Sequence, residues 1–186
     1  RTAVWGINPG RFGAGVTGLS FTDPFALTEI LGMETTITGR RELSAEFVWM
    51  VIEAYGGAEK FYHDFFVSAL SPLGFIKDDK NINFYDDARF QQAIEPRIIE
   101  WVRQQEGAGL RTDRCIVLGT GKLKDVMEKK LRQHLDYEHV DYLEHKLQKC
   151  REHGVLEPDE LAQRRAPEVA REESQHPGAA LALVRL

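Results

Sequence analysis

The chain has 186 residues, 42% of them apolar, which suits one domain with a sizeable core and hardly leaves room for two. No apolar run is long enough to span a membrane and no signal-peptide pattern is present, so we expect a monomeric cytoplasmic protein with no membrane partner. The formal net charge of −5 argues against binding to nucleic acid by bulk attraction, although Arg40-Arg41 and the lysines from 122 to 130 are candidate local basic patches.

The two cysteines, Cys115 and Cys150, form neither a disulfide framework nor a metal-ligand cluster. We therefore expect free thiols and no metal site. Because the chain begins at Arg1, directly on an apolar run, we also expect that a further N-terminal segment precedes it.

The first predicted strand covers residues 2–7 and leads into a glycine-rich loop. Residues 6–18 hold five of the 16 glycines. Glycine is favoured where the backbone takes a positive φ or comes close to a ligand, so we interpret the loop as one that encloses something, with Asn8 at its mouth. A plain strand-to-helix connection is the alternative.

The remaining elements alternate between helix and strand. Asp23-Pro24 predicts the start of a helix that ends near Gly32, and Gly56-Gly57 ends a helix that begins at Ser44. A strand over 65–70 is followed by the turn 71–74 and a polar loop over 77–83. The later predictions are a helix over 85–105 that is kinked or split at Pro96, a strand over 115–118, a helix over 122–134 and a strand over 139–143.

This alternation predicts an α/β fold with a mostly parallel sheet and helices on both faces. Ligands of such sheets bind outside the carboxyl ends of the strands, so the loops that begin at Asn8, Ser71, Gly119 and Glu144 should meet at one edge. Residues 1–149 are predicted to form this domain. Residues 150–186, rich in proline and charge, are predicted to be an atypical tail that is partly helical or poorly ordered.

Several motifs resemble those of a known family. The run Gly6-Ile7-Asn8-Pro9-Gly10-Arg11-Phe12-Gly13, with Thr17-Gly18 and Phe21, resembles the first motif of the single-strand-selective monofunctional branch of the uracil-DNA glycosylases, and especially its bacterial relatives. The turn 71–75, Lys80-Asn81 and the run 118–122 follow in the family's order, so the resemblance covers about residues 2–145.

The resemblance implies a three-layer α/β/α sandwich around a parallel sheet of four strands. It also implies a DNA repair hydrolase that flips uracil out of DNA, cleaves its N-glycosidic bond and leaves an abasic site, with DNA as partner and no metal or cofactor.

Two residues match the family's catalytic positions. The transition state has a cationic sugar and an anionic base, so it needs an oriented water on one side and a donor to the base on the other. Asn8 matches the water-holding residue and His145 the donor to O2 of uracil. The family has His-Pro and a loop that wedges into the duplex, whereas Lys146 follows His145 here, so His176-Pro177 is the alternative. A missing wedge favours single strands or mismatches.

The resemblance also implies contacts with the base and with DNA. Phe21 matches the aromatic on which uracil stacks, although plain core packing is the alternative, and Asn81 matches the amide that pairs with the uracil edge, with Asn83 as its competitor. The other substrate-binding candidates are Gly6, Ile7, Pro9, Gly10, Phe12, Gly18, Ser71 and Pro72. The DNA-binding candidates are Arg11, Gly119, Gly121 and Lys122.

Two other functions are kept as hypotheses. One is a catalytically inactive nucleic-acid-binding module of the same fold. The other is a nucleotide-binding protein that uses residues 119–122 as a phosphate loop, but such a loop requires Gly-x-x-x-x-Gly-Lys followed by Ser or Thr, and Leu123 follows Lys122 here.

Overall fold

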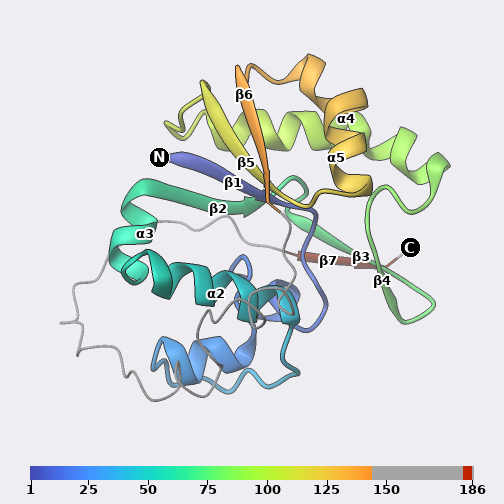
Figure 1. Cartoon of the computed structure of the whole chain (residues 1–186). Coiled ribbons are helices and arrows are strands. Elements are labelled where there is room, and N and C mark those ends of the chain that lie inside the picture. The colour runs from blue at the N-terminus through green and yellow to red at the C-terminus, as the bar shows by residue number, and fades with distance from the viewer. Residues whose placement is uncertain (144–181, 186) are drawn as a thin grey trace.

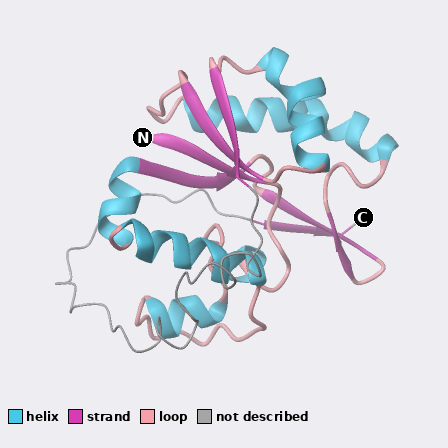
Figure 2. Cartoon of the chain, in the orientation of Figure 1, coloured by secondary structure: helices cyan, strands magenta, loops and turns pink. Residues whose placement is uncertain are grey.

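The computed structural model of the chain describes residues 1–143 and 182–185 (Figure 1). Its centre is a sheet of four parallel strands in the order β2-β1-β5-β6, drawn in magenta with the other strands in Figure 2. The strands are β1 (Thr2–Gly6), β2 (Phe65–Ala69), β5 (Arg114–Leu118) and β6 (His139–Leu143). The predicted α/β fold with a four-stranded parallel sheet is therefore confirmed.

Helical segments cover both faces of this sheet (Figure 1). One face carries α2 (Leu43–Tyr55) and α3 (Ala58–Asp64), and the other carries α4 (Ala88–Glu106) and α5 (Lys122–Val126), which continues as η2 (Met127–Leu131) and η3 (Arg132–His134). Two short segments, α1 (Ala14–Thr17) and η1 (Ala26–Ile30), lie between β1 and α2 in the chain. None of the helices in the described residues is long and apolar enough to cross a membrane.

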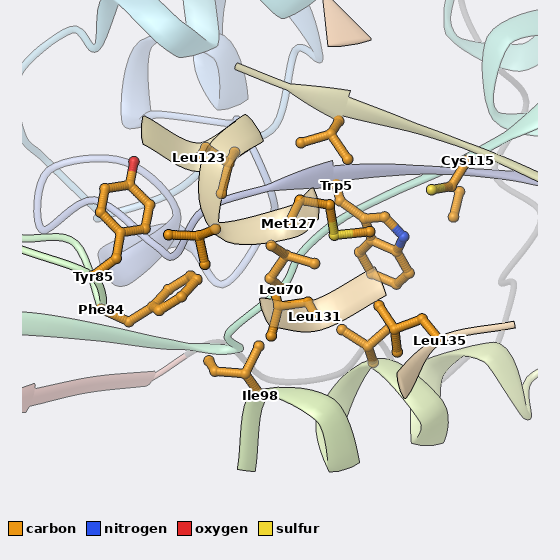
Figure 3. Close-up of a cluster of buried hydrophobic side chains, with 14 of the residues drawn as sticks. Trp5, Leu70, Phe84, Tyr85, Ile98, Cys115, Leu123, Met127, Leu131 and Leu135 are labelled. Atoms are coloured by element: carbon orange, nitrogen blue, oxygen red, sulfur yellow. The ribbon is translucent and has the colours of Figure 1, made fainter. Parts of the chain in front are cut away.

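Strand β1 separates two hydrophobic cores. Because successive side chains of a strand point to opposite faces, Ala3 and Trp5 enter the core under α4 and α5, while Val4 enters the core under α2. Figure 3 shows the first of these cores, where Trp5 lies among side chains of several elements. Its labelled residues include Leu70, Ile98, Met127 and Leu131. Side chains on each face of the sheet thus pack into a hydrophobic core, and this packing holds the carboxyl ends of the strands in place.

The predicted helix ends agree with the structure in most places. Asp23 caps its helix, since Oδ1 accepts from Ala26 N at 2.8 Å. Asp87, two residues after the predicted start at Tyr85, caps α4 by accepting from Phe90 N at 2.9 Å. Pro96 lies inside α4, which continues to Glu106, so the alternative that the helix is split at this residue was wrong.

A second sheet was not predicted. The turn and polar loop expected over residues 71–83 instead contain a hairpin of β3 (Leu73–Lys77) and β4 (Lys80–Ile82), and β7 (Ala182–Arg185) pairs in parallel with β3. The turn residues Asp78 and Asp79 have φ of 48° and 55°, the left-handed conformation that a two-residue hairpin requires and that Asp tolerates. The helices expected in the tail between 150 and 181 lie outside the described residues.

Candidate functional site

A cavity of about 370 Å³ opens at the carboxyl ends of β1, β2 and β5, and its volume lies in the usual range for small-molecule sites. Its wall comes from the loop after β1, the start of α2 and the segment around β4. It is lined by Gly6, Ile7, Asn8, Pro9, Gly10, Ala14, Ser20, Phe21, Glu42, Leu43, Ser44, Ala69, Asn81, Asn83 and Leu118.

Asn8 is held in one orientation by the backbone after β4. Its Nδ2 donates to Ile82 O at 3.3 Å, and its Oδ1 accepts from Phe84 N at 3.2 Å. These two bonds define which side of the amide carries the oxygen and which carries the nitrogen. Since a side-chain amide has two N–H groups and two acceptor positions, one of each is left beside the cavity.

Phe21 forms part of the cavity wall, and its backbone has a conformation that is uncommon for residues other than glycine. Its φ is 52°, and its ring lies against Gly6 at the end of β1, so that a Cβ on Gly6 would be 2.5 Å from Cζ of the ring. Gly6 is therefore required by the close approach of Phe21. Backbone strain of this kind is concentrated at functional sites, where the surrounding structure enforces it.

Both candidate base-recognition asparagines line the cavity. Asn81 is exposed, and its Oδ1 accepts from the backbone N–H of Arg11 at 3.2 Å, which links the hairpin to the glycine-rich loop. Asn83 is half-buried, and its backbone N–H donates to Asp86 at 2.7 Å. Either side chain is placed to meet a ligand in the cavity.

Glu42 is a cavity residue that the sequence analysis missed. Its Oε1 accepts from Phe12 N at 3.3 Å, and the carboxylate also accepts from the backbone N–H of Gly13. Burial raises the pKa of Glu42, the two backbone bonds oppose that rise, and the nearby Asp23 adds to it. The backbone N–H of Glu42 in turn donates to Asp23 Oδ2 at 2.8 Å.

The glycine-rich loop encloses this carboxylate. A Cβ on Gly10 would lie 2.9 Å from Cδ of Glu42, and a Cβ on Gly13 would overlap the same group. The sequence predicted a loop that encloses something. At Gly10 and Gly13, the enclosed group is the side chain of Glu42, a residue of the protein itself. Gly10 also lines the cavity.

Comparison with known proteins places the chain in a family. No family model and no curated protein matches the sequence. The structure is similar to the crystal structure of wild-type SMUG2 from Pedobacter heparinus, with 33% sequence identity, a TM-score of 0.75, and coverage of 88% of this chain and 72% of that one. The chain belongs to the SMUG2 family. Its fold is the uracil-DNA glycosylase-like fold that the motifs around Asn8 and Asn81 predicted.

In this SMUG2-family chain, several predicted substrate-binding residues do not line the cavity. The ring of Phe12 contacts the guanidinium groups of Arg11 and Arg40. Gly18 ends α1 with a φ of 74°. Ser71 is fully buried, and its Oγ accepts from Leu73 N and donates to Leu73 O, so it shapes the turn that Pro72 continues.

The predicted DNA-binding residues after β5 also have local contacts. A Cβ on Gly119 would lie 3.1 Å from Leu123, so this glycine lets the loop approach α5. Gly121 immediately precedes α5, and the Nζ of Lys122 lies 3.7 Å from Asp86 and 5.2 Å from the Tyr85 ring centroid. None of the three lines the cavity.

His145 and its alternative His176 lie outside the described residues of this SMUG2-family chain. Within the part that the structure describes, no group of three or more His, Cys, Asp or Glu side chains is arranged to hold a metal ion.

Proposed function

We propose that this protein is a monofunctional uracil-DNA glycosylase, which hydrolyses the N-glycosidic bond of uracil in DNA and leaves an abasic site. The observation that carries the proposal is the fixed amide of Asn8 beside Phe21, in a cavity at the carboxyl ends of a SMUG2-family sheet. The cavity supports an extruded nucleotide as substrate, since a base inside a duplex does not reach such a site. The proposed partner is therefore DNA, and the proposed location is the cytoplasm.

Asn8 holds the attacking water in this proposal. As the C1′–N1 bond breaks, the sugar becomes cationic and uracil departs as an anion. The water adds its hydroxyl to C1′, and its proton neutralises the departing base. An amide is too weak a base to ionise water, so its free acceptor and donor positions orient the water while bond breaking is already advanced. His145 is proposed as the donor to O2 of the departing uracil.

Phe21 and Asn81 recognise the base. A base stacked on an aromatic ring gains on the order of 1–3 kcal/mol. Uracil presents an N3–H donor and an O4 acceptor, which match the oxygen and nitrogen of one amide. Cytosine presents the opposite pattern and cannot form either hydrogen bond with this amide, at about 1–3 kcal/mol for each buried group that is left unpaired.

The test is an excision assay with purified protein. A single-stranded oligonucleotide with one uracil is expected to give strand cleavage at that position after alkali treatment, while the same oligonucleotide with thymine stays intact. A matched duplex run in parallel measures the strand preference. Binding to the uracil strand with no alkali-labile site would identify the inactive nucleic-acid-binding module and would falsify the glycosylase proposal.

The base-recognition proposal predicts an effect of Asn81→Asp. The carboxylate cannot donate to O4, so kcat/KM for uracil is expected to fall about tenfold or more, from the loss of one hydrogen bond to the base. Asn83→Asp is the matched control on the same segment. Excision rates on uracil and cytosine strands measure both. If only Asn83→Asp changes the selectivity, the recognition role belongs to Asn83.

A further inference from the structure

Three arginines border the cavity on two chain segments. Arg11 directly follows Gly10, and Arg40 and Arg41 directly precede Glu42; both of these neighbours line the cavity. Arg40 and Arg41 are exposed, while Arg11 is half-buried. The three arginines are thus direct neighbours in the chain of residues that form the cavity wall.

Aromatic rings hold these guanidinium groups in place. Cζ of Arg11 lies 4.5 Å and Cζ of Arg40 lies 5.2 Å from the centroid of the same Phe12 ring, and Cζ of Arg41 lies 3.3 Å from that of Phe25. A guanidinium that stacks on a ring keeps its N–H donors in its own plane, free for other acceptors. The stacking therefore orders the charges and leaves most of their hydrogen-bonding capacity available.

These arginines differ from four others among the described residues. Arg97, Arg111, Arg114 and Arg132 each form an ion pair with a carboxylate. Within residues 1–143, no ion pair is found for Arg11, Arg40 or Arg41, and the side chain of Arg11 donates to the backbone oxygen of Asp79. Ordered guanidinium groups without a carboxylate partner are suited to bind an external anion.

We propose that Arg11, Arg40 and Arg41 form a phosphate-binding rim that holds the DNA backbone beside the nucleotide in the cavity. The proposal rests on the proposed function, because it takes DNA as the anion. A net charge of −5 means that attraction to DNA has to come from a local surface, and planar guanidinium donors fit phosphate oxygens. Phosphate contacts position the strand without reading its sequence.

Leu43 supplies a matched control on the same surface. Its side chain is 71% exposed, and it lines the cavity two residues after Arg41. A leucine side chain carries no charge and no hydrogen-bond donor for a phosphate. Replacing Leu43 by alanine therefore changes affinity without changing the number of ions released on binding.

The experiment measures DNA affinity as a function of salt concentration. The probe is a duplex with one abasic-site analogue that cannot be cleaved, and fluorescence anisotropy gives Kd across about 50–200 mM salt. Arg40→Gln and Arg41→Gln are each expected to reduce the slope of log K against log salt by about 0.9, and the double variant by about 1.8. Arg40→Lys should keep the slope, since lysine retains the charge.

Two control variants distinguish a phosphate-binding rim from an effect on DNA binding that any surface substitution would have. Arg97→Gln on α4 and Leu43→Ala are both expected to leave the slope unchanged. Unchanged slopes in Arg40→Gln and Arg41→Gln would overturn the rim even if the protein excises uracil. Reduced slopes in a protein that binds DNA but excises no uracil would support the rim and reject the proposed activity, and a protein that does not bind DNA would overturn both.

Discussion

Replacement of Asn8 by alanine is expected to lower the rate of uracil excision by about 10²–10³-fold under single-turnover conditions, the usual loss when a preorganised hydrogen-bonding group is removed. The structure gives the reason, because the amide is fixed by Ile82 O and Phe84 N and leaves one donor and one acceptor at the cavity. Affinity for a duplex with an abasic-site analogue should fall far less than the rate, because alanine removes the contact with water and leaves the DNA contacts intact.

The same substitution also affects stability, so a control is needed. Phe84 is buried, and in Asn8→Ala its backbone N–H loses Oδ1 of Asn8 as acceptor, which costs about 1–3 kcal/mol in the free energy of unfolding. Gln105→Ala is the matched control, because this amide donates to Ala69 O and Trp101 O but does not line the cavity. Equal losses of rate in the two variants, or equal losses of rate and affinity in Asn8→Ala, would remove Asn8 from catalysis.

The parallel sheet was predictable because its central strands, β1 and β5, are largely buried. Runs such as 115–118 are apolar over their whole length, and such runs with crossover helices between them specify a parallel sheet. The hairpin of β3 and β4 was missed because Lys80, Asn81 and Ile82 form a short strand with one apolar residue. Strand β7 was missed because its partner is β3, far away in the sequence.

The cavity was partly predictable for a similar reason. Asn8 and Phe21 belong to one continuous motif, and Asn81 follows a recognisable strand and turn, so the resemblance of these motifs to a known family identified them. Glu42 belongs to no such pattern, since its hydrogen bond to Phe12 spans 30 residues. The available signal was indirect, namely the glycine-rich loop itself, which predicted that something is enclosed but not that it is Glu42.

A second large effect is expected at Glu42. In Glu42→Ala, the N–H groups of Phe12 and Gly13 lose their carboxylate acceptor, so the loop that carries Asn8 is held less firmly. We expect the free energy of unfolding to fall by about 1–3 kcal/mol and excision to fall by about tenfold or more, as expected for misplacement of a reacting group. Glu42→Gln keeps one acceptor oxygen and should give an intermediate loss in both denaturant unfolding and excision assays.

A double-mutant cycle with Gly10 tests whether the carboxylate is the cause. Gly10 does not have a positive φ, so alanine is tolerated by its backbone, but the new Cβ would lie 2.9 Å from Cδ of Glu42. Gly10→Ala should therefore be strongly destabilising alone and nearly neutral in Glu42→Ala, because the group that it displaces is then gone. Gly107→Ala, at a helical φ of −59°, is the control expected to be additive with Glu42→Ala. If the cost of Gly10→Ala is the same in both backgrounds, Gly10 accommodates something other than Glu42, and the loop is held in place by its own backbone contacts.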